Sequence, residues 1–250
     1  MGAPGGAPLG LRIRLRSAAS TQEIATGLAR TGAAVGTTVI AGSQTEGRGR
    51  GGRAWASPPG GIYLSRLAAA PPSDRGWVPL AVGLGVREVA AGFGAPAWLR
   101  WPNDVVADGP GPGRKLAGVL VDAVAGPSGD RLVVGVGLNV AAPVEAFDEP
   151  IRSAAASLVA LAGRPIDPRD VEGPLEDAID RAVDALRTDA GRARVAREAR
   201  AALFGVGRVA RVDGARRGPI VGLGDAGTLV VATASGPEEI ASGVVAVEGG

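Results

Sequence analysis

The chain has 250 residues, 46% of them apolar and 21% charged, and its formal net charge at pH 7 is +2. This length and apolar content suffice for the core of one full domain and a small second one. Because the sequence contains no histidine and no cysteine, it excludes histidine-dependent triads, histidine-ligated metal centres, disulfides and thiolate catalysis.

The N-terminal segment, residues 1–10, is rich in glycine and proline and is expected to be disordered. It lacks the charged and apolar regions of a signal peptide. No apolar run in the chain approaches the roughly 18 residues of a membrane span. We therefore expect a cytoplasmic protein that does not associate with membranes.

The first predicted helix begins at Ser20 or Thr21, either of which can act as its cap, and runs to about Arg30. Glu23 stands near the position that completes a capping box. The following run, residues 34–41, is rich in β-branched side chains and predicts a strand.

An arginine loop follows between residues 44 and 60, where Arg48, Arg50 and Arg53 stand among several glycines. Glycine lets backbone N–H groups approach a ligand closely, and arginine presents a forked, permanently charged donor for carboxylate and phosphate. The loop therefore predicts a negatively charged ligand. Without histidine or cysteine, catalysis must rest on positioning and charge stabilisation, which suits phosphoryl and acyl-phosphate chemistry.

The same loop allows two other interpretations. Gly47, Gly49 and Gly52 match the dinucleotide-binding fingerprint, but the prolines at 58–59 follow where that fingerprint requires a helix. Arg-Gly segments also bind RNA without sequence preference. Such segments are normally repeated and low in complexity, whereas this one is single and lies between apolar segments.

The next elements alternate strand and helix patterns. Residues 61–67 alternate as a strand, and residues 77–92 carry a broad apolar surface that is typical of a buried helix. Short strands are predicted at residues 98–101 and 105–106, on either side of a Pro-Asn-Asp turn.

Two apolar, β-branched runs, residues 115–123 and 132–140, flank a Gly-rich turn and predict an antiparallel hairpin. Helical composition then extends over residues 153–203, with expected breaks at residues 163–168 and near residues 173–174. Beyond Gly205 short β runs indicate a small barrel, so the whole chain is expected to be α+β with a C-terminal all-β module. The β runs cover residues 208–212, 219–222, 228–232 and 243–247.

Four further segments place polar residues inside apolar surroundings, and each has an ordinary structural explanation. Ser20-Thr21-Gln22 can be a helix cap, and Trp101-Pro-Asn-Asp104 a plain turn. Lys115 in Arg114–Gly118 can mark the solvated start of a strand, and Asn139 in Gly135–Asn139 can end one.

Together with the arginine loop, however, these segments resemble one family, the biotin protein ligases, also called biotin-[acetyl-CoA-carboxylase] ligases. The resemblance spans about Arg12 to Gly250. Its most specific elements are G-R-G-R-x-G-R-x-W at 47–55, W-P-N-D at 101–104, K-L-A-G-V-L at 115–120 and V-G-x-G-x-N at 134–139.

The resemblance implies a catalytic domain like that of class II synthetases, with a mixed sheet flanked by helices, and a small SH3-like C-terminal barrel. The corresponding boundaries are a disordered leader at 1–10, a biotin- and ATP-binding catalytic domain at 11–203 and the SH3-like domain at 204–250. It also allows a homodimer.

The resemblance further implies a two-step ligase reaction. Biotin and ATP, with Mg²⁺ on the triphosphate, give biotinyl-5'-AMP and pyrophosphate, and the adenylate then acylates one lysine of a biotin carboxyl carrier protein. Biotin's carboxylate is already ionised at neutral pH, so the first step needs no general base. It needs cations that suppress repulsion between the carboxylate and the α-phosphate.

The family's functional residues fall on matching positions of this chain. The catalytic residues would be Arg48, Arg50, Lys115 and Asp104. Asp104 would either hold the magnesium ion or help deprotonate the acceptor lysine. The residues implied to bind biotin are Ser20, Thr21, Gln22, Gln44, Arg48, Gly49, Arg50, Lys115 and Gly118. Those implied to bind ATP are Arg50, Arg53, Trp55, Asn103, Lys115 and Asn139.

The chain departs from the family pattern in places. The family usually shows Asp-Ser-Thr-Asn where this chain has Ala19-Ser-Thr-Gln22, which leaves the contact of Gln22 open. Glu46 puts a carboxylate beside the arginine loop, where it is expected to pair with an arginine or face solvent. The similarity begins near the start of the chain, so we expect no N-terminal helix-turn-helix and no DNA binding.

Two rival functions remain at this point. A lipoate or octanoate ligase shares the fold and the adenylation chemistry with a different acyl group, although the W-P-N-D and arginine-loop elements favour biotin. A non-enzymatic RNA-binding module would use the arginine loop and the small barrel, but it predicts exposed aromatics for base stacking, and only 3% of this chain is aromatic.

Overall fold

The computed structural model describes residues 10–71, 75–107, 111, 113–127 and 129–248. The predicted disordered leader, residues 1–10, lies outside this part of the chain except for its last residue. Among the described residues, no helix is both long and apolar enough to cross a lipid bilayer.

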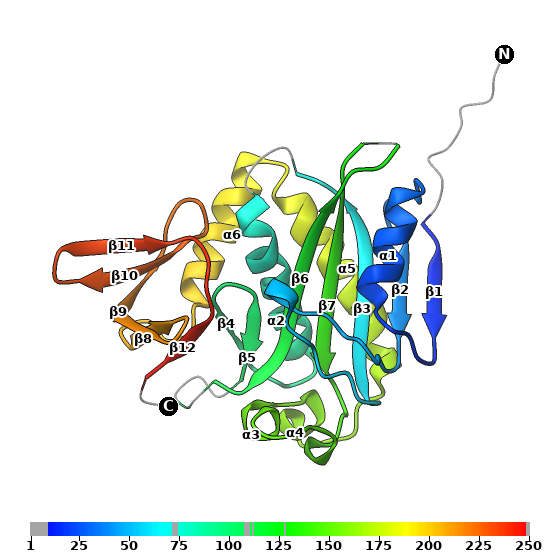
Figure 1. Cartoon of the computed structure of the whole chain (residues 1–250), viewed down its shortest axis with the longest axis horizontal. Coiled ribbons are helices and arrows are strands. Elements are labelled where there is room, and N and C mark those ends of the chain that lie inside the picture. The colour runs from blue at the N-terminus through cyan, green and yellow to red at the C-terminus, as the bar shows by residue number, and fades with distance from the viewer. Residues whose placement is uncertain (1–9, 72–74, 108–110, 112, 128, 249–250) are drawn as a thin grey trace.

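A seven-stranded mixed sheet forms the centre of the molecule (Figure 1). Only its first two strands pair in parallel, and every other neighbouring pair is antiparallel. In spatial order the strands are β1 (Arg12–Leu15), β2 (Thr38–Ala41), β3 (Gly61–Ala69), β7 (Arg131–Asn139), β6 (Lys115–Val124), β5 (Asp104–Val106) and β4 (Trp98–Arg100).

The sheet confirms the predicted mixed α/β architecture, the hairpin of β6 and β7 and the short strands around the Pro-Asn-Asp turn. The strand predicted over residues 34–41 is shorter, since only Thr38–Ala41 is extended. The preceding residues form a turn in which the Thr37 N–H donates to the carbonyl oxygen of Ala34 at 3.1 Å. Gly36, with φ of 86°, gives that turn its left-handed residue.

The two faces of the sheet are covered unequally. One face carries the main core, where β-strand side chains pack against α2 (Val78–Gly92) and α5 (Pro168–Ala185). Of the described helices, α1 (Thr21–Arg30) packs on the other face, against β2, β3 and β7, through a small apolar cluster that includes Val39 and Val133. The part of this face that α1 leaves free, over β6 and β7, is where the candidate site lies (Figure 1).

The helical region after β7 differs from its prediction in the positions of its breaks, because residues 155–157 and 186–188 also interrupt it. α4 (Leu158–Ala162) ends at Gly163 as expected, but α5 continues through Pro174, so the break predicted at residues 173–174 is wrong. The apolar stripe of α5 on either side of Pro174 packs without interruption against α2, and this burial outweighs the local cost of the proline. The helical region is interrupted instead between α5 and α6 (Asp189–Ala201). The hydroxyl of Thr188 caps α6 by accepting from Gly191 N–H at 3.1 Å.

The C-terminal region forms a second sheet of five antiparallel strands, in the order β11-β10-β9-β8-β12. Trp77 and Trp101 tie it to the first sheet by donating their indole N–H groups, each at 2.8 Å, to the carbonyl oxygens of Asp225 and Gly227. The sequence missed β11, because Gly-Pro-Glu-Glu has little intrinsic β-propensity. The strands are β8 (Val209–Val212), β9 (Ala215–Leu223), β10 (Leu229–Thr233), β11 (Gly236–Ile240) and β12 (Val245–Val247).

Candidate active site

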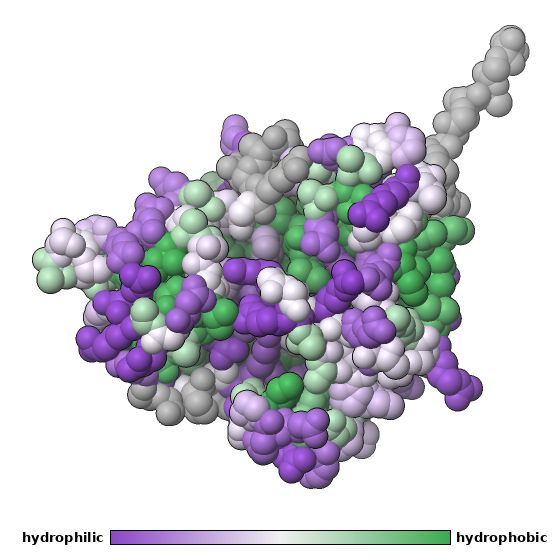
Figure 2. Space-filling model, in the orientation of Figure 1, coloured by the Kyte–Doolittle hydropathy of each residue, from purple (hydrophilic) through white to green (hydrophobic). Residues whose placement is uncertain are grey.

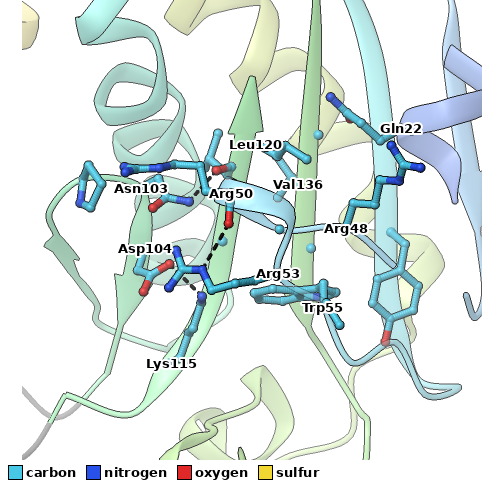
Figure 3. Close-up of a pocket in the computed structure, with 18 of the residues that line it drawn as sticks. Gln22, Arg48, Arg50, Arg53, Trp55, Asn103, Asp104, Lys115, Leu120 and Val136 are labelled. Atoms are coloured by element: carbon cyan, nitrogen blue, oxygen red, sulfur yellow. Dashed lines mark hydrogen bonds and ion pairs between the residues drawn. The ribbon is translucent and has the colours of Figure 1, made fainter. Parts of the chain in front are cut away.

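A cavity opens on the free face of the large sheet, bounded by the arginine loop, the first turn of α1, the turn between β4 and β5, and residues 243–245 just before and within β12. In the space-filling view, hydrophilic side chains gather across the middle of this side of the molecule (Figure 2). Every predicted site residue except Asn139 lines the cavity, and Figure 3 shows several of them, among them Arg50, Asp104 and Lys115. The predicted residues that line the cavity are Ser20, Thr21, Gln22, Gln44, Arg48, Gly49, Arg50, Arg53, Trp55, Asn103, Asp104, Lys115 and Gly118.

The arginine loop is a tight hairpin rather than an open coil. Trp55 N–H donates to the carbonyl oxygen of Gly47 at 2.8 Å, and Gly49 N–H donates to the carbonyl oxygen of Arg53 at 2.7 Å. A Cβ at Gly47 would clash with the Trp55 carbonyl oxygen and with Ser57, so only glycine permits this crossing. The hairpin thereby holds its arginines at the rim of the cavity.

The arginines of the loop have different electrostatic surroundings. Arg48 forms an ion pair with Glu23 of α1, and both side chains are exposed. Arg50 is half-buried, and within the described residues its guanidinium forms no ion pair; its Nη2 lies 3.5 Å from the carbonyl oxygen of Gly243. Burial, and secondarily the charge of Arg53, lower the pKa of Arg50 from its ordinary value. A bound anion would relieve both effects, so the loop presents an incompletely compensated positive charge.

Lys115 is held at the cavity by a carboxylate and an aromatic ring. Its Nζ lies 2.7 Å from Asp104 Oδ1 and 4.7 Å from the centroid of the Trp55 ring, an arrangement that favours the charged ammonium. Arg100, which the sequence did not indicate, binds the other Asp104 oxygen at 2.9 Å. Both oxygens of Asp104 therefore face cations of the protein itself.

Glycines on β6 and β7 explain where the Trp55 indole lies. Gly118 and Gly137 are direct partners in the register of the two strands, so the missing side chains form one shallow depression in the sheet. A Cβ at Gly118 would lie 2.7 Å from Trp55 Cζ3, and one at Gly137 would lie 2.5 Å from its Nε1. The indole Nε1 is buried and has no hydrogen-bond partner among the described residues, which leaves a donor free for a ligand or a water molecule.

The opposite end of the cavity is an uncharged polar wall. The Gln44 side chain, rather than that of Ser20, caps α1, because its Oε1 accepts from Thr21 N–H at 2.8 Å. Ser20 is the N-cap by position only, and its buried Oγ has no partner within the described residues. Glu23, expected near a capping-box position, instead reaches Arg48.

Comparison with known proteins agrees with this geometry. Residues 15–139, which contain all four motifs, match the model of the biotin/lipoate A/B protein ligase family. The chain belongs to this family. The biotin-[acetyl-CoA-carboxylase] ligase of Paracoccus denitrificans is 34% identical over 214 residues, which cover 81% of this chain and 86% of that protein.

Other members of the biotin/lipoate ligase family are similar over shorter stretches or in structure. The bifunctional ligase/repressor BirA of Bacillus spizizenii is 34% identical over 154 residues, 59% of this chain and 46% of that protein. This chain thus spans about half the length of the first curated relatives. A biotin protein ligase from Aquifex aeolicus, solved in complex with biotin and ATP, superposes with a TM-score of 0.80 at 29% identity, covering 96% of this chain and 99% of that one.

One family-derived assignment is not at the cavity. Asn139 is 4% exposed and does not line the cavity; its Nδ2 donates to the Lys115 backbone carbonyl at 3.3 Å. The assignment of Asn139 as an ATP contact stays a prediction: its Nδ2 holds the start of β6, while its buried Oδ1 has no hydrogen-bond partner among the described residues. Glu46 is exposed and forms no ion pair within the described residues, so of its two expected placements the solvent-facing one is found.

Sequence reasoning missed several residues that line the cavity. Tyr63 and Ser65 stand on one face of β3 and alternate with apolar residues that face the core. Polar side chains at alternate positions of a largely buried strand could have indicated a site, because the sequence of such a strand is normally apolar throughout. The other missed residues include Arg100, Gly135, Gly137 and residues 243–245.

Tyr63 offers a direct test of burial beside the cavity. Its hydroxyl donates to the Pro58 carbonyl oxygen at 2.7 Å, and burial raises the pKa of the phenol well above its ordinary value. The resulting stability is present below the unfolded pKa of about 10 and is lost as the pH rises toward the folded-state pKa. Tyr63 is the only tyrosine, so tyrosinate absorbance should titrate near the ordinary pKa in the denatured chain and at higher pH in the folded protein; coincident titrations would contradict its burial.

Proposed function

We propose that this protein is a biotin protein ligase, which activates biotin with ATP to biotinyl-5'-AMP and then transfers the biotinyl group to one lysine of a biotin carboxyl carrier protein. The observation that carries the proposal is that cations and an uncharged polar wall meet in one cavity. Arg50 and Lys115 supply the cations. The relatives from Paracoccus denitrificans and Aquifex aeolicus support it by name, and the latter binds biotin and ATP.

In the first step, a carboxylate oxygen of biotin attacks the α-phosphorus of ATP, a carboxyl–phosphate bond forms and pyrophosphate leaves. Both reacting groups are anionic, so the barrier contains a large repulsive contribution. Lys115, positioned by Asp104 and Trp55, would lie at the meeting point of carboxylate and α-phosphate. Arg50 would reach both from the loop above, and no general base is needed.

Biotin's cyclic urea would bind the polar wall. A urea offers two N–H donors and one carbonyl acceptor, and the wall contains hydroxyl and amide groups of both kinds at Ser20, Thr21 and Gln44. The buried, unpartnered hydroxyl of Ser20 is the strongest single indication of a polar ligand atom there. Neither lipoate nor octanoate carries such a group, so this wall favours biotin over the sister acids.

ATP would occupy the half of the cavity beside Trp55, Asn103 and Arg53. Mg²⁺ would accompany the triphosphate and offset part of its charge. Among the described residues, Asp104 is the only carboxylate that lines the cavity, and its two oxygens are ion-paired with Arg100 and Lys115. Because both its oxygens are already paired with protein cations, we assign Asp104 to positioning Lys115 rather than to binding the ion.

In the second step, the carrier lysine's amine attacks the acyl carbon of the adenylate, an amide forms, and AMP leaves with the carboxyl oxygen on its phosphate. The amine must lose a proton, for which the nearby Asp104 carboxylate is our candidate acceptor.

We also propose that residues 11–203 form the catalytic domain and residues 204–250 an SH3-like module. The cytoplasmic location and the homodimer remain predictions.

The decisive experiment is pyrophosphate exchange into ATP by purified protein with magnesium, with biotin, lipoate or octanoate added separately. Exchange that depends on biotin alone is expected. Dependence on lipoate or octanoate would replace the proposed substrate, and no exchange with any acid would reject the proposed activity. In the last case, strong and steeply salt-dependent binding of RNA would favour the non-enzymatic alternative.

Arg50→Ala is expected to release biotinyl-5'-AMP about tenfold to a hundredfold faster than the wild-type protein, the range for loss of one charge-assisted contact. Its guanidinium is half-buried over the cavity and forms no ion pair among the described residues. Retention of labelled adenylate through rapid gel filtration measures the effect. Arg164→Ala, on an exposed arginine outside the cavity, is the control; equal retention by both variants would contradict the assignment of Arg50.

A further inference from the structure

Asp122 lies near the end of β6, outside every motif that marks the site. β5 pairs with β6 only as far as Gly118, so Asp122 stands beyond that pairing and its side chain is exposed. In the period-two pattern of a strand it shares a face with Leu120 and Gly118, the cavity face. One Asp122 oxygen, Oδ2, accepts a hydrogen bond from Gln22 Nε2 at 2.8 Å.

Gln22 departs from the family's usual asparagine, and the structure shows what the longer side chain does. It extends from the first turn of α1 across Gly135, where any Cβ would clash with its Oε1. Its Nε2 donates to Asp122 and also, at 3.0 Å, to the Val133 carbonyl oxygen. Its Oε1 accepts from the buried Ser65 hydroxyl at 2.9 Å.

These partners fix the orientation of the Gln22 side-chain amide. A carboxylate and a backbone carbonyl can only accept hydrogen bonds, so the two hydrogens of Nε2 must face Asp122 and Val133. The amide oxygen is therefore presented to Ser65, and the single hydrogen of Ser65 is committed to it. Ser65 consequently offers lone pairs, not a hydrogen, to its remaining neighbours.

The directions of the neighbouring hydrogen bonds along the polar wall are fixed in the same way. Thr21 Oγ1 lies 3.0 Å from Ser65 Oγ and 3.1 Å from Gln44 Oε1, and its one hydrogen serves these two acceptors. Gln44 is fixed in turn, because its Oε1 accepts from Thr21 N–H and its Nε2 donates to Ser57 Oγ at 2.9 Å. The Ser57 hydroxyl in turn donates a hydrogen bond to the Trp55 carbonyl oxygen at 3.0 Å.

We propose that Asp122 is a positioning residue, which holds the Gln22 amide in one orientation and, through it, the Ser65 hydroxyl, and thereby makes the wall at Ser65 and Thr21 a hydrogen-bond acceptor for a ureido N–H of biotin. This inference rests on the proposed function and specifies which part of the substrate the wall selects. Gln22 serves as the connector between an exposed carboxylate and a buried hydroxyl, rather than as the biotin ligand that the family pattern implies.

Loss of Asp122 removes the carboxylate that holds Nε2. Only the Val133 carbonyl oxygen then holds Nε2, so the reversed orientation of the Gln22 amide, which offers Nε2 to Ser65 and frees the Ser65 hydrogen to point into the cavity, becomes more populated. A donor would then face the donor N–H of the urea. The change affects recognition of that ring position and leaves the phosphate side of the cavity, at Arg50 and Lys115, untouched.

The test compares Asp122→Ala and Ser65→Ala with wild-type protein, by calorimetric binding of biotin and of analogues in which one or the other ureido N–H is replaced by ring oxygen. We expect the wild type to prefer biotin over at least one analogue by about tenfold or more. Both variants should reduce this preference about fivefold or more, and Asp122→Ala should raise KM for biotin while KM for ATP and kcat at saturation stay nearly unchanged.

Three controls separate positioning from a general loss of structure. Asp122→Asn keeps an acceptor oxygen and should retain most of the preference. Ala123→Ser alters the adjacent exposed residue, on the opposite face of β6, and should retain all of it. Desthiobiotin keeps the cyclic urea, so its affinity relative to biotin should be the same in every variant.

Wild-type preference in both Asp122→Ala and Ser65→Ala would overturn the inference while leaving the proposed function intact. An equal fall in affinity for biotin and for both analogues would also overturn it, because a merely structural role predicts that result. Failure of the wild-type protein itself to bind biotin would instead reject the proposed function, and this inference with it.

Discussion

Lys115→Ala is expected to slow formation of biotinyl-5'-AMP by about a hundredfold to a thousandfold, the range seen when one preorganised charge-stabilising group is removed. The Lys115 ammonium is 2.7 Å from Asp104 and lies over Trp55 at the cavity. Its removal takes away a positive charge and also leaves Asp104 with Arg100 as its only ion-pair partner among the described residues. The carboxylate then repels the incoming carboxylate and phosphate of the substrates.

The expected loss of rate therefore has two causes, the missing Lys115 charge and the altered surroundings of Asp104. A second substitution can distinguish them. Asp104→Asn introduced into the Lys115→Ala background should recover part of the lost rate, because it removes a carboxylate that has lost one of its two cationic partners. In an otherwise wild-type chain, the same Asp104→Asn change should be harmful. Single-turnover formation of the adenylate from ATP and biotin measures both effects, and the difference between the two backgrounds is the coupling between the residues.

Folding controls are straightforward for this pair. The Lys115 side chain is 32% exposed and lies outside the apolar core, so thermal unfolding should change little. A Lys115→Ala variant that forms the adenylate at the wild-type rate would remove Lys115 from the reaction centre. An equal fall caused by Asp104→Asn in both backgrounds would show that Asp104 acts independently of Lys115.

The sequence predicted those parts of the site that lie within contiguous motifs. The arginine loop, Trp101–Asp104 and the start of β6 each carry residues whose chemistry is evident locally, and the structure brings them to one cavity. The hairpin of β6 and β7 was predicted for the same reason, since two apolar runs and a Gly-rich turn are neighbours in the chain.

The rest depended on contacts between distant segments, which no local pattern contains. Gln44 caps a helix that begins 23 residues earlier in the chain, and Asp122 contacts Gln22 across 100 residues. Pro174 indicated a helix break by local chemistry, but burial of the stripe on either side of it against α2 prevailed. Asn139 matched a motif, yet its side chain turns toward the backbone of β6 rather than into the cavity.

Gly137→Ala is expected to lower kcat/KM by about a hundredfold without unfolding the protein, since displacements of about 1 Å at a reacting centre can cost that much. The new Cβ would lie 2.5 Å from Trp55 Nε1. β7 is hydrogen-bonded to β3 on one side and to β6 on the other, so its backbone cannot retreat. The indole must leave its depression, and Lys115, which lies over that ring, loses part of its support.

Two comparisons make this prediction specific to the ring. Gly222→Ala also adds a methyl group to a strand glycine, but nothing lies within 4 Å of the new Cβ, so activity should be unchanged. Gly118→Ala would place its Cβ 2.7 Å from the other end of the same indole and should resemble Gly137→Ala. Because either methyl group alone displaces the ring, the double variant should be little worse than each single one; fully additive losses would mean that the two glycines act on different partners.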